Sequence, residues 1–383
     1  MKKRKILVLT GKRGGFGAMK PMLREMRDCD EIELQIVVTD QHVSSQFGNT
    51  ISEVENEFQV MAAVDMEQDS DTGLSRARAV GRCLQKVSSV LASSKPDICV
   101  LYGDRGEVLA TAIAATMLNI PIAHIQGGDV SGSLDEQMRH ATTKLSHLHF
   151  PATESSAERL RRMGEEEWRI HLVGDNHVDL IVAGEFEGPE RIARELGLDL
   201  KHPILVVLQH SETTRPDQAF DQMEKTLRAV IKTGHQTVIV HPCSDQGYEG
   251  ILSAISTFAV TPQFRIRVNL EAPIFWGLLN VASLLIGNSS AGLIEAPYFK
   301  LPAINIGRRQ SGRMHAENVI HADHDVGEIE RAINMGLSDP EFRNKIATCA
   351  QPFGDGKAGA RIFEVLSKLD LHKADLLTKV MTY

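Results

Sequence analysis

The stretch ASLLIGNSSAGLIEAP, residues 282–297, has the pattern of a buried strand, a turn of small residues and a helix. Glycine and serine at a strand-to-helix turn let a backbone approach a ligand closely, and a first helical turn offers N–H groups without partners. We predict that Ser289 and Ser290 bind a diphosphate here, and that Glu295, one turn later, accepts hydrogen bonds from a ribose. An ordinary helix N-cap formed by Asn288 or Ser289 is the alternative.

The same alternation of apolar runs and helical spacers recurs along the chain. The first half has four such runs, at Lys5–Thr10, Leu34–Thr39, Asp97–Tyr102 and Ile120–Ile125. The second half has five, at Pro203–Leu208, Thr237–Val240, Phe264–Val268, Leu284–Ile286 and Ala303–Ile306. Short strands alternating with helices predict parallel sheets covered on both faces. We therefore expect an α/β fold of two Rossmann-like, doubly wound domains that face each other across a cleft.

The domain boundary is predicted in the polar segment Gly184–Pro189, which glycine and proline interrupt. The chain has 383 residues, more than one typical core accommodates. This gives an amino-terminal domain at residues 1–183 and a carboxy-terminal domain at residues 184–361. Helical apolar spacing in the tail predicts a helix at residues 362–383 that crosses back onto the first domain.

Composition excludes several classes of function. The formal net charge of −8 argues against a sequence-independent grip on nucleic acid or on an anionic membrane. No apolar segment approaches the length of a membrane span. The five cysteines are widely spaced, and the absence of a C-x-x-C pair indicates neither a disulfide framework nor a zinc site. We expect a cytoplasmic protein without a structural metal.

Polar residues follow the first and third strands of the amino-terminal half. The Gly-rich stretch Gly11–Gly17 is interpreted either as a tight strand–helix turn or as an anion-contacting loop with Arg13 as its charge. Asp104 and Arg105 follow the third strand, where the carboxyl end of a parallel strand favours catalysis. In the alternative interpretation, Asp104 caps the helix that starts near Glu107.

Residues 126–140 form the densest polar constellation of the chain. Its two acids, Asp129 and Asp135, lie six residues apart in a loop that contains three glycines. Carboxylates in different environments divide general-acid and general-base work, so both are candidate catalytic groups. Alternatively, Asp135 is a helix N-cap, and Arg139 and His140 line the solvated face of that helix.

The carboxy-terminal half carries polar groups at equivalent strand ends. His210 follows its first strand and His241 its second, with Asp245 four residues further on. Two histidines at neighbouring strand ends favour catalysis or phosphate contact. The loop at residues 307–313 contains three arginines, which suit an anionic ligand, although a solvated basic turn gives the same pattern.

The ordered set of these segments resembles the hydrolysing UDP-N-acetylglucosamine 2-epimerases of the bacterial sialic-acid and legionaminic-acid pathways. The matching motifs run from the Arg13 loop to Arg313. They comprise Gly103-Asp104-Arg105, Gly127-Gly128-Asp129, Asp135 with Arg139-His140, residues 144–149, His210, His241-Pro242 with Asp245, Gly287-Asn288-Ser289-Ser290 with Gly292, Glu295-Ala296-Pro297, and Arg309-Gln310 with Arg313. That family has the two-domain architecture of GT-B glycosyltransferases, in agreement with the repeated strand pattern.

The resemblance implies anti elimination of UDP across C1–C2 of a nucleotide sugar, through a 2-acetamidoglucal that water then hydrates. No cofactor or metal is needed for this chemistry, and a homodimer or higher homo-oligomer is expected. The resemblance assigns proton transfer to Asp104, Asp129 and Asp135, and assistance of the leaving diphosphate to His210. The residues expected to bind the nucleotide sugar are Arg13, Arg105, His241, Asp245, Ser289, Ser290, Glu295 and Arg313.

Four positions depart from the family pattern. Asp129 stands where glutamate is usual, Gly15 where an acid is usual, Ser211 where proline follows the histidine, and Cys243 where asparagine is common. These departures leave UDP-N-acetylglucosamine and a UDP- or GDP-linked 2,4-diacetamido-trideoxy sugar open as substrates. A GT-B glycosyltransferase and a non-catalytic two-lobed binding protein are the rival functions.

Overall fold

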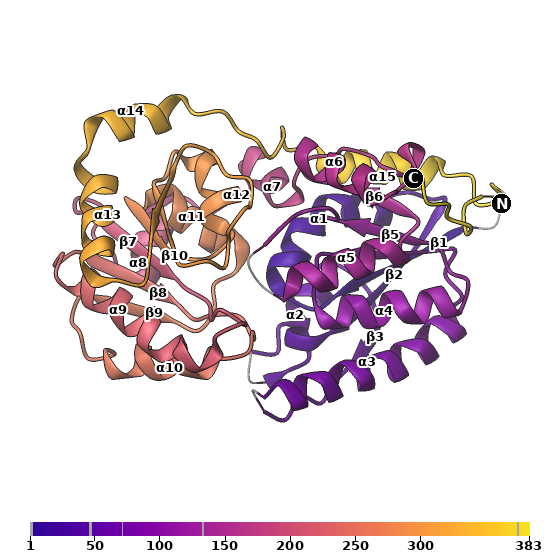
Figure 1. Cartoon of the computed structure of the whole chain (residues 1–383), viewed down its shortest axis with the longest axis horizontal. Coiled ribbons are helices and arrows are strands. Elements are labelled where there is room, and N and C mark those ends of the chain that lie inside the picture. Colours follow the sequence, from indigo (N-terminus) through magenta and orange to yellow (C-terminus); the bar gives the residue numbers. More distant parts are fainter. Residues whose placement is uncertain (1–2, 46–47, 71, 132–133, 374) are drawn as a thin grey trace. The chain divides into compact units, whose positions relative to one another are not determined.

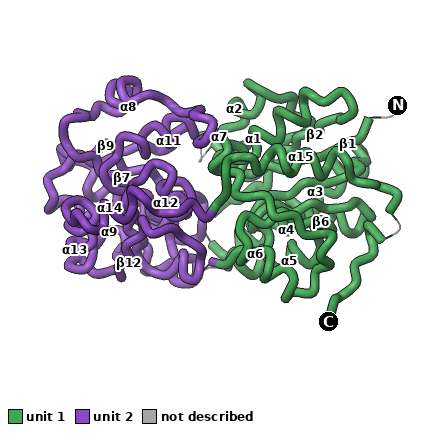
Figure 2. The backbone as a smooth tube through the Cα atoms, turned by 90° about the horizontal axis from the view of Figure 1, so that it is seen from above, with its two compact units in different colours: residues 1–130, 134–179, 353–383 green, residues 131–133, 180–352 purple. Residues whose placement is uncertain are grey.

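The computed structural model describes residues 3–45, 48–70, 72–131, 134–373 and 375–383. The chain forms two compact units, coloured separately in Figure 2. Unit 1 comprises Met1–Val130, Leu134–Asp179 and Phe353–Tyr383, and unit 2 consists mainly of Leu180–Pro352. The division therefore falls between Asp179 and Leu180, before the expected boundary at 183/184, and the chain returns to unit 1 at Phe353 rather than at residue 362.

Unit 1 is built on a parallel sheet with the strand order β3-β2-β1-β4-β5-β6. Its strands are β1 (Arg4–Thr10), β2 (Ile32–Thr39), β3 (Val60–Val64), β4 (Ile98–Tyr102), β5 (Ile122–Ile125) and β6 (Leu148–Phe150). Its longer helices are α1 (Arg13–Arg27), α2 (Ile51–Glu55), α3 (Gly73–Ser94), α4 (Gly106–Met117), α5 (Asp135–Leu145), α6 (Glu154–Arg162) and α15 (Ala358–Lys368). Helices cover both faces of the sheet (Figure 1).

Successive residues of β1 point into two different cores. Ile6 and Val8 pack with α1 and α15, whereas Leu7 and Leu9 pack with α3 and α4. A strand that is buried on both faces reads as a continuous apolar run, because neither alternating position faces water. This is why the apolar runs of the sequence located these strands.

Unit 2 repeats the arrangement with the strand order β12-β11-β10-β7-β8-β9, again parallel throughout. Its strands are β7 (Ile204–Leu208), β8 (Gln236–Val240), β9 (Phe264–Arg267), β10 (Leu284–Gly287), β11 (Ala303–Ile306) and β12 (Val319–Ala322). The helices of this part of the chain are α7 (Asp179–Val182), α8 (Pro189–Leu196), α9 (Ala219–Ile231), α10 (Tyr248–Thr257), α11 (Ala272–Val281), α12 (Ala291–Ile294), α13 (Val326–Ser338) and α14 (Pro340–Thr348).

Both sheets share one topology, in which the strand order reverses beside the first strand of each unit. The reversal lies between β1 and β4 in unit 1, and between β7 and β10 in unit 2. In doubly wound folds, ligands bind outside the carboxyl ends of the strands at such a switch point. The predicted α/β class with two Rossmann-like units is confirmed, and each candidate loop can be placed relative to these two positions.

Each of the nine predicted strands is found, with ends that differ by at most two residues. Three further strands, β3, β6 and β12, were not predicted. β3 and β12 are edge strands whose residues are partly exposed, and β6 has only three residues. Such strands lack the apolar run by which a strand buried on both faces is recognised.

The tail packs on unit 1 as expected, but its helix was placed wrongly. Helix α15 is Ala358–Lys368 rather than residues 362–383, and a β-carbon on Gly359 would come within 2.8 Å of the backbone nitrogen of Met22 in α1. The helix ends where the Arg4 guanidinium binds the carbonyl oxygens of its last turn, Leu366 and Ser367, and that of Leu369. A basic group at this point satisfies carbonyls that a longer helix would have paired internally.

Beyond α15, buried cations hold the last residues of the chain. The fully buried Arg169 donates to the carbonyl oxygens of Asp375, Leu376 and Thr378. Lys379 donates to the carbonyl oxygen of Lys144, at the carboxyl end of α5, at 3.1 Å, and lies 2.6 Å from a carboxylate oxygen of Glu165. The carbonyls of the tail thus bind side chains rather than N–H groups of a further helical turn.

Glu165 is the centre of a buried charge cluster beneath the tail. Its side chain has no exposed surface and lies 2.8 Å from Lys144 and 2.9 Å from the Nε2 atom of His149. Burial acts to raise the pKa of Glu165, but the hydrogen bonds and charges of His149, Lys144 and Lys379 lower it from 4.5 to about 2. The carboxylate therefore ionises more readily in the folded protein than in the unfolded chain.

Glu165→Gln is expected to lower the free energy of unfolding at pH 7 by about 3 kcal/mol, the equivalent of this pKa shift. A carboxyl group whose pKa is lowered on folding stabilises the protein above its unfolded pKa of 4.5. That contribution is lost as the pH falls from 4.5 toward 2, so the two proteins should converge in this range. Urea unfolding at several pH values measures the difference, with Glu154→Gln, an exposed glutamate, as the control. A difference that does not shrink below pH 4.5 contradicts the assignment.

Among the described residues, no helix combines the length and the apolarity needed to cross a bilayer.

Candidate active site

Asp104 lies in the turn after β4, at the switch point of unit 1. The turn is possible because Gly103 adopts a φ of 84°, a left-handed conformation that side chains disfavour. A carboxylate oxygen of Asp104 forms an ion pair with Arg139 of α5. Helix α4 starts at Gly106 with Arg105 at its N-cap, so the alternative that Asp104 caps this helix is wrong.

Arg139 brings the carboxylates of unit 1 together. Its side chain is 2% exposed, and besides Asp104 it lies 3.6 Å from a carboxylate oxygen of Asp129. It also donates to the carbonyl oxygen of Gln126 at 3.1 Å. Burial acts to lower the pKa of Arg139, but the charges of Asp104, Asp129 and Asp135 raise it. Asp104 and Asp129 thus lie against one guanidinium, on which Asp135 also acts through its charge, and the alternative that Arg139 lines a solvated face is wrong.

The alternatives for the start of α5 are also settled. Asp135 is the first residue of the helix, and Leu134 occupies the N-cap position, so Asp135 is not the cap. Arg139 is buried, which excludes the solvated face for it. His140 is partly buried and lies 3.6 Å from the carboxylate of Glu136. A helix that carries an acid in its first turn and an arginine one turn later directs both toward the same region.

Glycine shapes the turn that carries Asp129. Gly128 has a φ of 77°, and a β-carbon there would overlap the carbonyl oxygen of Ser156. The guanidinium of Arg159 binds the carbonyl oxygen of Gly128 from α6. The backbone of Asp129 is therefore held on one side by α6, while its carboxylate faces Arg139.

A second hydrogen-bonded network adjoins the acids. The hydroxyl of Tyr102, at the end of β4, lies 2.9 Å from the Nδ1 atom of His177. Asp175 contacts the same ring nitrogen at 2.9 Å and accepts a hydrogen bond from Gln126 at 2.8 Å. Sequence reasoning missed Asp175 and His177, although the polar run Gly174–His177 close to the domain boundary was a usable signal.

Two of the three arginines predicted to contact the nucleotide sugar belong to unit 1, and both form ion pairs within that unit. Arg105 lies 3.4 Å from a carboxylate oxygen of Asp40 and 3.4 Å from one of Glu107. Burial and the nearby Asp40 raise the pKa of Glu107 to about 7. Arg13 forms an ion pair with Glu53. Each arginine is thus positioned by an acid.

The Gly-rich stretch after β1 is mostly helical rather than a loop. Helix α1 begins at Arg13, so three of the glycines lie within it. Gly15 faces β4, where a β-carbon would lie 3.3 Å from the ring of Tyr102. Small residues here allow close packing of helix and strand.

In unit 2, Asn288 joins the two strands that border the switch point. Its side-chain oxygen accepts from the backbone N–H of His210 at 2.7 Å, and its amide donates to the His210 carbonyl at 2.9 Å. The close approach requires Gly287, where a β-carbon would overlap the carbonyl oxygen of Leu208. Asn288 is therefore not a helix cap, and it fixes the backbone of the predicted catalytic histidine.

The tautomer of His210 follows from its neighbours. The backbone N–H of Cys243 donates to the Nδ1 atom of His210 at 3.1 Å, which leaves the ring proton of the neutral imidazole on Nε2. Asp245, two residues after Cys243, pairs with Arg309 at 2.9 Å. His241, at the end of β8, is half-buried, and burial lowers its pKa.

The serine turn differs from the prediction in one respect. Ser290 occupies the N-cap position of α12 without a side-chain cap hydrogen bond, and the helix is only one turn long, Ala291–Ile294. The Oγ atom of Ser289 accepts from the N–H of Ala291 at 3.3 Å. Glu295 follows the turn and is 7% exposed. The tightness of the turn, rather than a long helix, brings these residues together.

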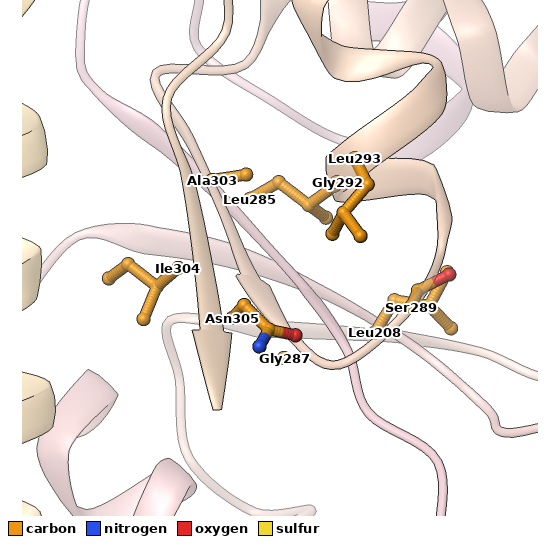
Figure 3. A pocket seen from close by; sticks show the side chains of 9 residues that line it. All are labelled: Leu208, Leu285, Gly287, Ser289, Gly292, Leu293, Ala303, Ile304 and Asn305. Atoms are coloured by element: carbon orange, nitrogen blue, oxygen red, sulfur yellow. The ribbon is translucent and has the colours of Figure 1, made fainter. Parts of the chain in front are cut away.

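Figure 3 shows the turn from close by. A cavity of about 10 Å³ lies behind it, lined by apolar residues together with Gly287, Ser289 and Asn305. This volume suffices for no more than one water molecule, so the cavity itself is too small for an organic ligand.

The arginine loop after β11 is tied to the same turn. Gln310 donates to the carbonyl oxygen of Asn288 at 2.9 Å and accepts from Arg313 at 3.2 Å. Arg309, with its side chain 14% exposed, pairs with Asp245. The alternative of a solvated basic turn is therefore wrong for Arg309, and Arg313 is connected to the serine turn through one side chain.

The fold thus carries acids at the switch point of one unit and a histidine–serine–arginine set at that of the other. Residues 24–367 match the family described as UDP-N-acetylglucosamine 2-epimerase, and the chain belongs to this family of 2-epimerases.

Two relatives and one solved structure show the range of similarity. The UDP-N,N'-diacetylbacillosamine 2-epimerase (hydrolyzing) of Legionella pneumophila is 35% identical over 99% of this chain and 100% of its own. The UDP-N-acetylglucosamine 2-epimerase of Neisseria meningitidis is 30% identical over 88% of this chain and 89% of its own. A crystal structure of UDP-GlcNAc 2-epimerase from Neisseria meningitidis bound to UDP-GlcNAc superposes with a TM-score of 0.82, with 18% identity over 95% of this chain and 100% of that one.

Proposed function

We propose that the enzyme is a hydrolysing 2-epimerase that releases a free 2-acetamido sugar, inverted at C2, and UDP from a UDP-linked substrate. The observation that carries this proposal is the set of acids around Arg139: Asp104 and Asp129, which follow β4 and β5, and Asp135, which begins α5 and acts on Arg139 through its charge. Removal of a weakly acidic C2 proton needs a positioned base, and its return to the other face needs a positioned acid. Several carboxylates held by one buried cation meet this need.

Among the substrates, we favour a UDP-linked 2,4-diacetamido-trideoxy sugar over UDP-N-acetylglucosamine. The Legionella relative, which is named for diacetylbacillosamine, is similar along the whole chain at 35% identity, against 30% for the Neisseria enzyme named for N-acetylglucosamine. Asp129 in place of the usual glutamate shortens one acidic side chain by a methylene. A shift of the carboxylate by about one ångström is the scale at which substrate fit and rate change.

In the proposed reaction, Asp104, Asp129 and Asp135 carry the protons. The C2 proton passes to a carboxylate, the C1–O bond breaks, and UDP leaves with the electron pair as the C1–C2 double bond forms. Water then adds its oxygen to C1 while a proton returns to C2 from the opposite face. Arg139 orients Asp104 during these steps, as a charge-assisted pair does.

The second site meets the leaving group. His210 carries its proton on Nε2 and can donate to a phosphate oxygen as negative charge develops there. Ser289, Ser290 and Arg313 are proposed to bind the diphosphate, and Glu295 the ribose. Arg13 and Arg105 of unit 1, and His241 and Asp245 of unit 2, are proposed as further contacts of the nucleotide sugar.

Ser290→Ala is expected to weaken UDP binding about tenfold, the effect of losing one hydrogen bond to a charged oxygen. Isothermal titration with UDP measures the change. Ser256→Ala, which alters an exposed serine on α10 of the same unit, should leave the affinity as it is. An unchanged affinity in Ser290→Ala removes this residue from the diphosphate contacts.

Product analysis tests the reaction itself. The protein is incubated in D₂O without an acceptor, once with UDP-N-acetylglucosamine and once with UDP-N,N'-diacetylbacillosamine, and the products are followed by NMR. Free sugar inverted and deuterated at C2, together with UDP, is the expected result. An inverted sugar that stays linked to UDP indicates a non-hydrolysing epimerase. Turnover that occurs only after an acceptor is added indicates a glycosyltransferase, and the absence of any turnover indicates a binding protein.

Two further predictions accompany this function. A cytoplasmic location follows from the odd, widely spaced cysteines, and cell fractionation tests it. A homodimer or higher homo-oligomer follows from the family resemblance, and light scattering after gel filtration measures the mass.

A further inference from the structure

Three residues of unit 2 present metal-binding atoms to one another. His210 follows β7, and Cys243 and Asp245 follow the adjacent strand β8. One ligand atom from each of these residues lies within 4.8 Å of the other two. An imidazole nitrogen, a thiolate sulfur and a carboxylate oxygen are the three ligand types that Zn²⁺ takes in proteins.

The spacing of the first two ligands is close to that of a tetrahedral zinc site. The Sγ atom of Cys243 lies 3.1 Å from the Nδ1 atom of His210. Zn–N and Zn–S bonds of about 2.0 and 2.3 Å at a tetrahedral angle separate nitrogen and sulfur by about 3.5 Å. The two side chains would have to open by only about half an ångström, a change within rotamer adjustment for a cysteine. A cation at Nδ1 would take the place of the Cys243 N–H that now donates to it.

Neighbouring residues form hydrogen bonds that orient His210 and Asp245, as metal ligands are commonly oriented. Arg309 binds one carboxylate oxygen of Asp245 at 2.9 Å, and ligating carboxylates are commonly hydrogen-bonded in this way. The hydroxyl of Ser211 donates to the carbonyl oxygen of Gln246 at 2.6 Å, which links the two loops. Asn288 holds the backbone of His210 through two hydrogen bonds.

We propose that His210, Cys243 and Asp245 bind Zn²⁺, and that the bound cation inhibits the enzyme: it leaves the proton on Nε2 of His210, but through Nδ1 it ties the ring to Cys243 and Asp245, so that the ring cannot follow the departing phosphate. On binding, the Cys243 thiol releases its proton to solvent and a sulfur–zinc bond forms, while the fourth tetrahedral position takes a water molecule. Binding of the metal stands on the three side chains alone. Inhibition rests on the proposed role of His210 in the departure of UDP.

This chain has a cysteine at position 243, where asparagine is common in the 2-epimerase family pattern that the chain resembles. An amide is a far weaker zinc ligand than a thiolate. Cys243→Asn therefore restores the family residue and removes the proposed site in a single step. Cys29, a partly exposed cysteine of unit 1, is the matched control.

The binding test uses the full chain without an affinity tag, after treatment with a chelator. ZnCl₂ is titrated calorimetrically, and the zinc retained per chain is measured after gel filtration. We expect one Zn²⁺ per chain, with an affinity at least tenfold lower in Cys243→Asn and Cys243→Ala and unaltered in Cys29→Ala. Co²⁺ in place of zinc should produce a thiolate-to-cobalt absorption band that both Cys243 variants lack. No binding, or binding that survives in both Cys243 variants, overturns the site.

The inhibition test compares each protein with its own metal-free rate. ZnCl₂ should slow UDP release by the parent and by Cys29→Ala, and have at least tenfold less effect on Cys243→Asn. Zinc that binds at these residues without slowing UDP release overturns the inhibitory half of the proposal. If neither of the two UDP-linked substrates is turned over, the proposed function fails, while the calorimetric and cobalt results still decide the metal site.

Discussion

Asp104→Asn is expected to lower turnover by about two to four orders of magnitude, the usual contribution of a positioned proton-transferring group. Asparagine keeps the size of the side chain and can still accept a hydrogen bond from Arg139, but it has no basic oxygen to take a proton. Substrate affinity should stay close to that of the parent, since the lost interaction serves the transition state rather than the bound substrate. Steady-state kinetics of UDP release give the turnover number, and calorimetry gives the affinity for UDP.

The control for this variant is Asp30→Asn, which alters an exposed aspartate of the same unit and should turn over like the parent. Urea unfolding of Asp104→Asn separates loss of chemistry from loss of folded protein. If Asp104→Asn turned over at the parental rate, Asp104 would not be a proton-transferring residue, and the reaction would depend on Asp129 and Asp135.

Arg139→Met is expected to lower the free energy of unfolding by about 3–5 kcal/mol, the cost of removing one partner from a buried ion pair. The variant leaves Asp104 and Asp129, whose side chains are 17% and 15% exposed, without their common cation. It also leaves the carbonyl oxygen of Gln126 without its donor. Turnover should fall at least as far as in Asp104→Asn, because both acids lose their orientation together.

Urea unfolding measures the stability of Arg139→Met. The control is Arg162→Met, which alters an arginine of α6 that is 77% exposed and should change the free energy of unfolding by about 0.5 kcal/mol or less. Arg139→Lys makes the test sharper. A lysine keeps the charge but cannot hold two carboxylates and a carbonyl oxygen with one planar fork. It should therefore recover part of the stability and little of the turnover. Parental stability and turnover in Arg139→Met would show that this cation does not organise the site.

Of the two residues that these variants change, Arg139 is the harder one to identify from the sequence. Asp104 was recognisable because it follows a strand that is buried on both faces, where the sequence is a continuous apolar run. Arg139 lies in a helix of mixed polarity, and nothing in that pattern separates a buried arginine from a solvated one. Its role depends on the turns after β4 and β5, which deliver two carboxylates and a carbonyl oxygen to the same place.

The same reason explains the other differences. In the sequence, Arg309 is one of three arginines in a basic turn. In the structure its side chain is largely buried and pairs with Asp245, which lies in a different loop. In the sequence, Asn288 has the pattern of a helix cap, yet the oxygen and the amide of its side chain both bind the backbone of His210, far away in the sequence. The helix expected after the serine turn ends after one turn. In each case the partner comes from a distant strand end, and residue spacing carries no information about it.

The sequence alone determined the fold class, the positions of nine strands along the chain and the loops that carry polar groups. Strand burial and turn chemistry are local properties, so they leave periodic patterns that can be read directly. The tertiary structure decided which of those polar groups meet: three acids around Arg139, and His210 between Asn288 and Cys243. Such contacts arise only when parallel strands bring their carboxyl ends to one edge of a sheet, and the charges then select partners by distance rather than by position in the chain.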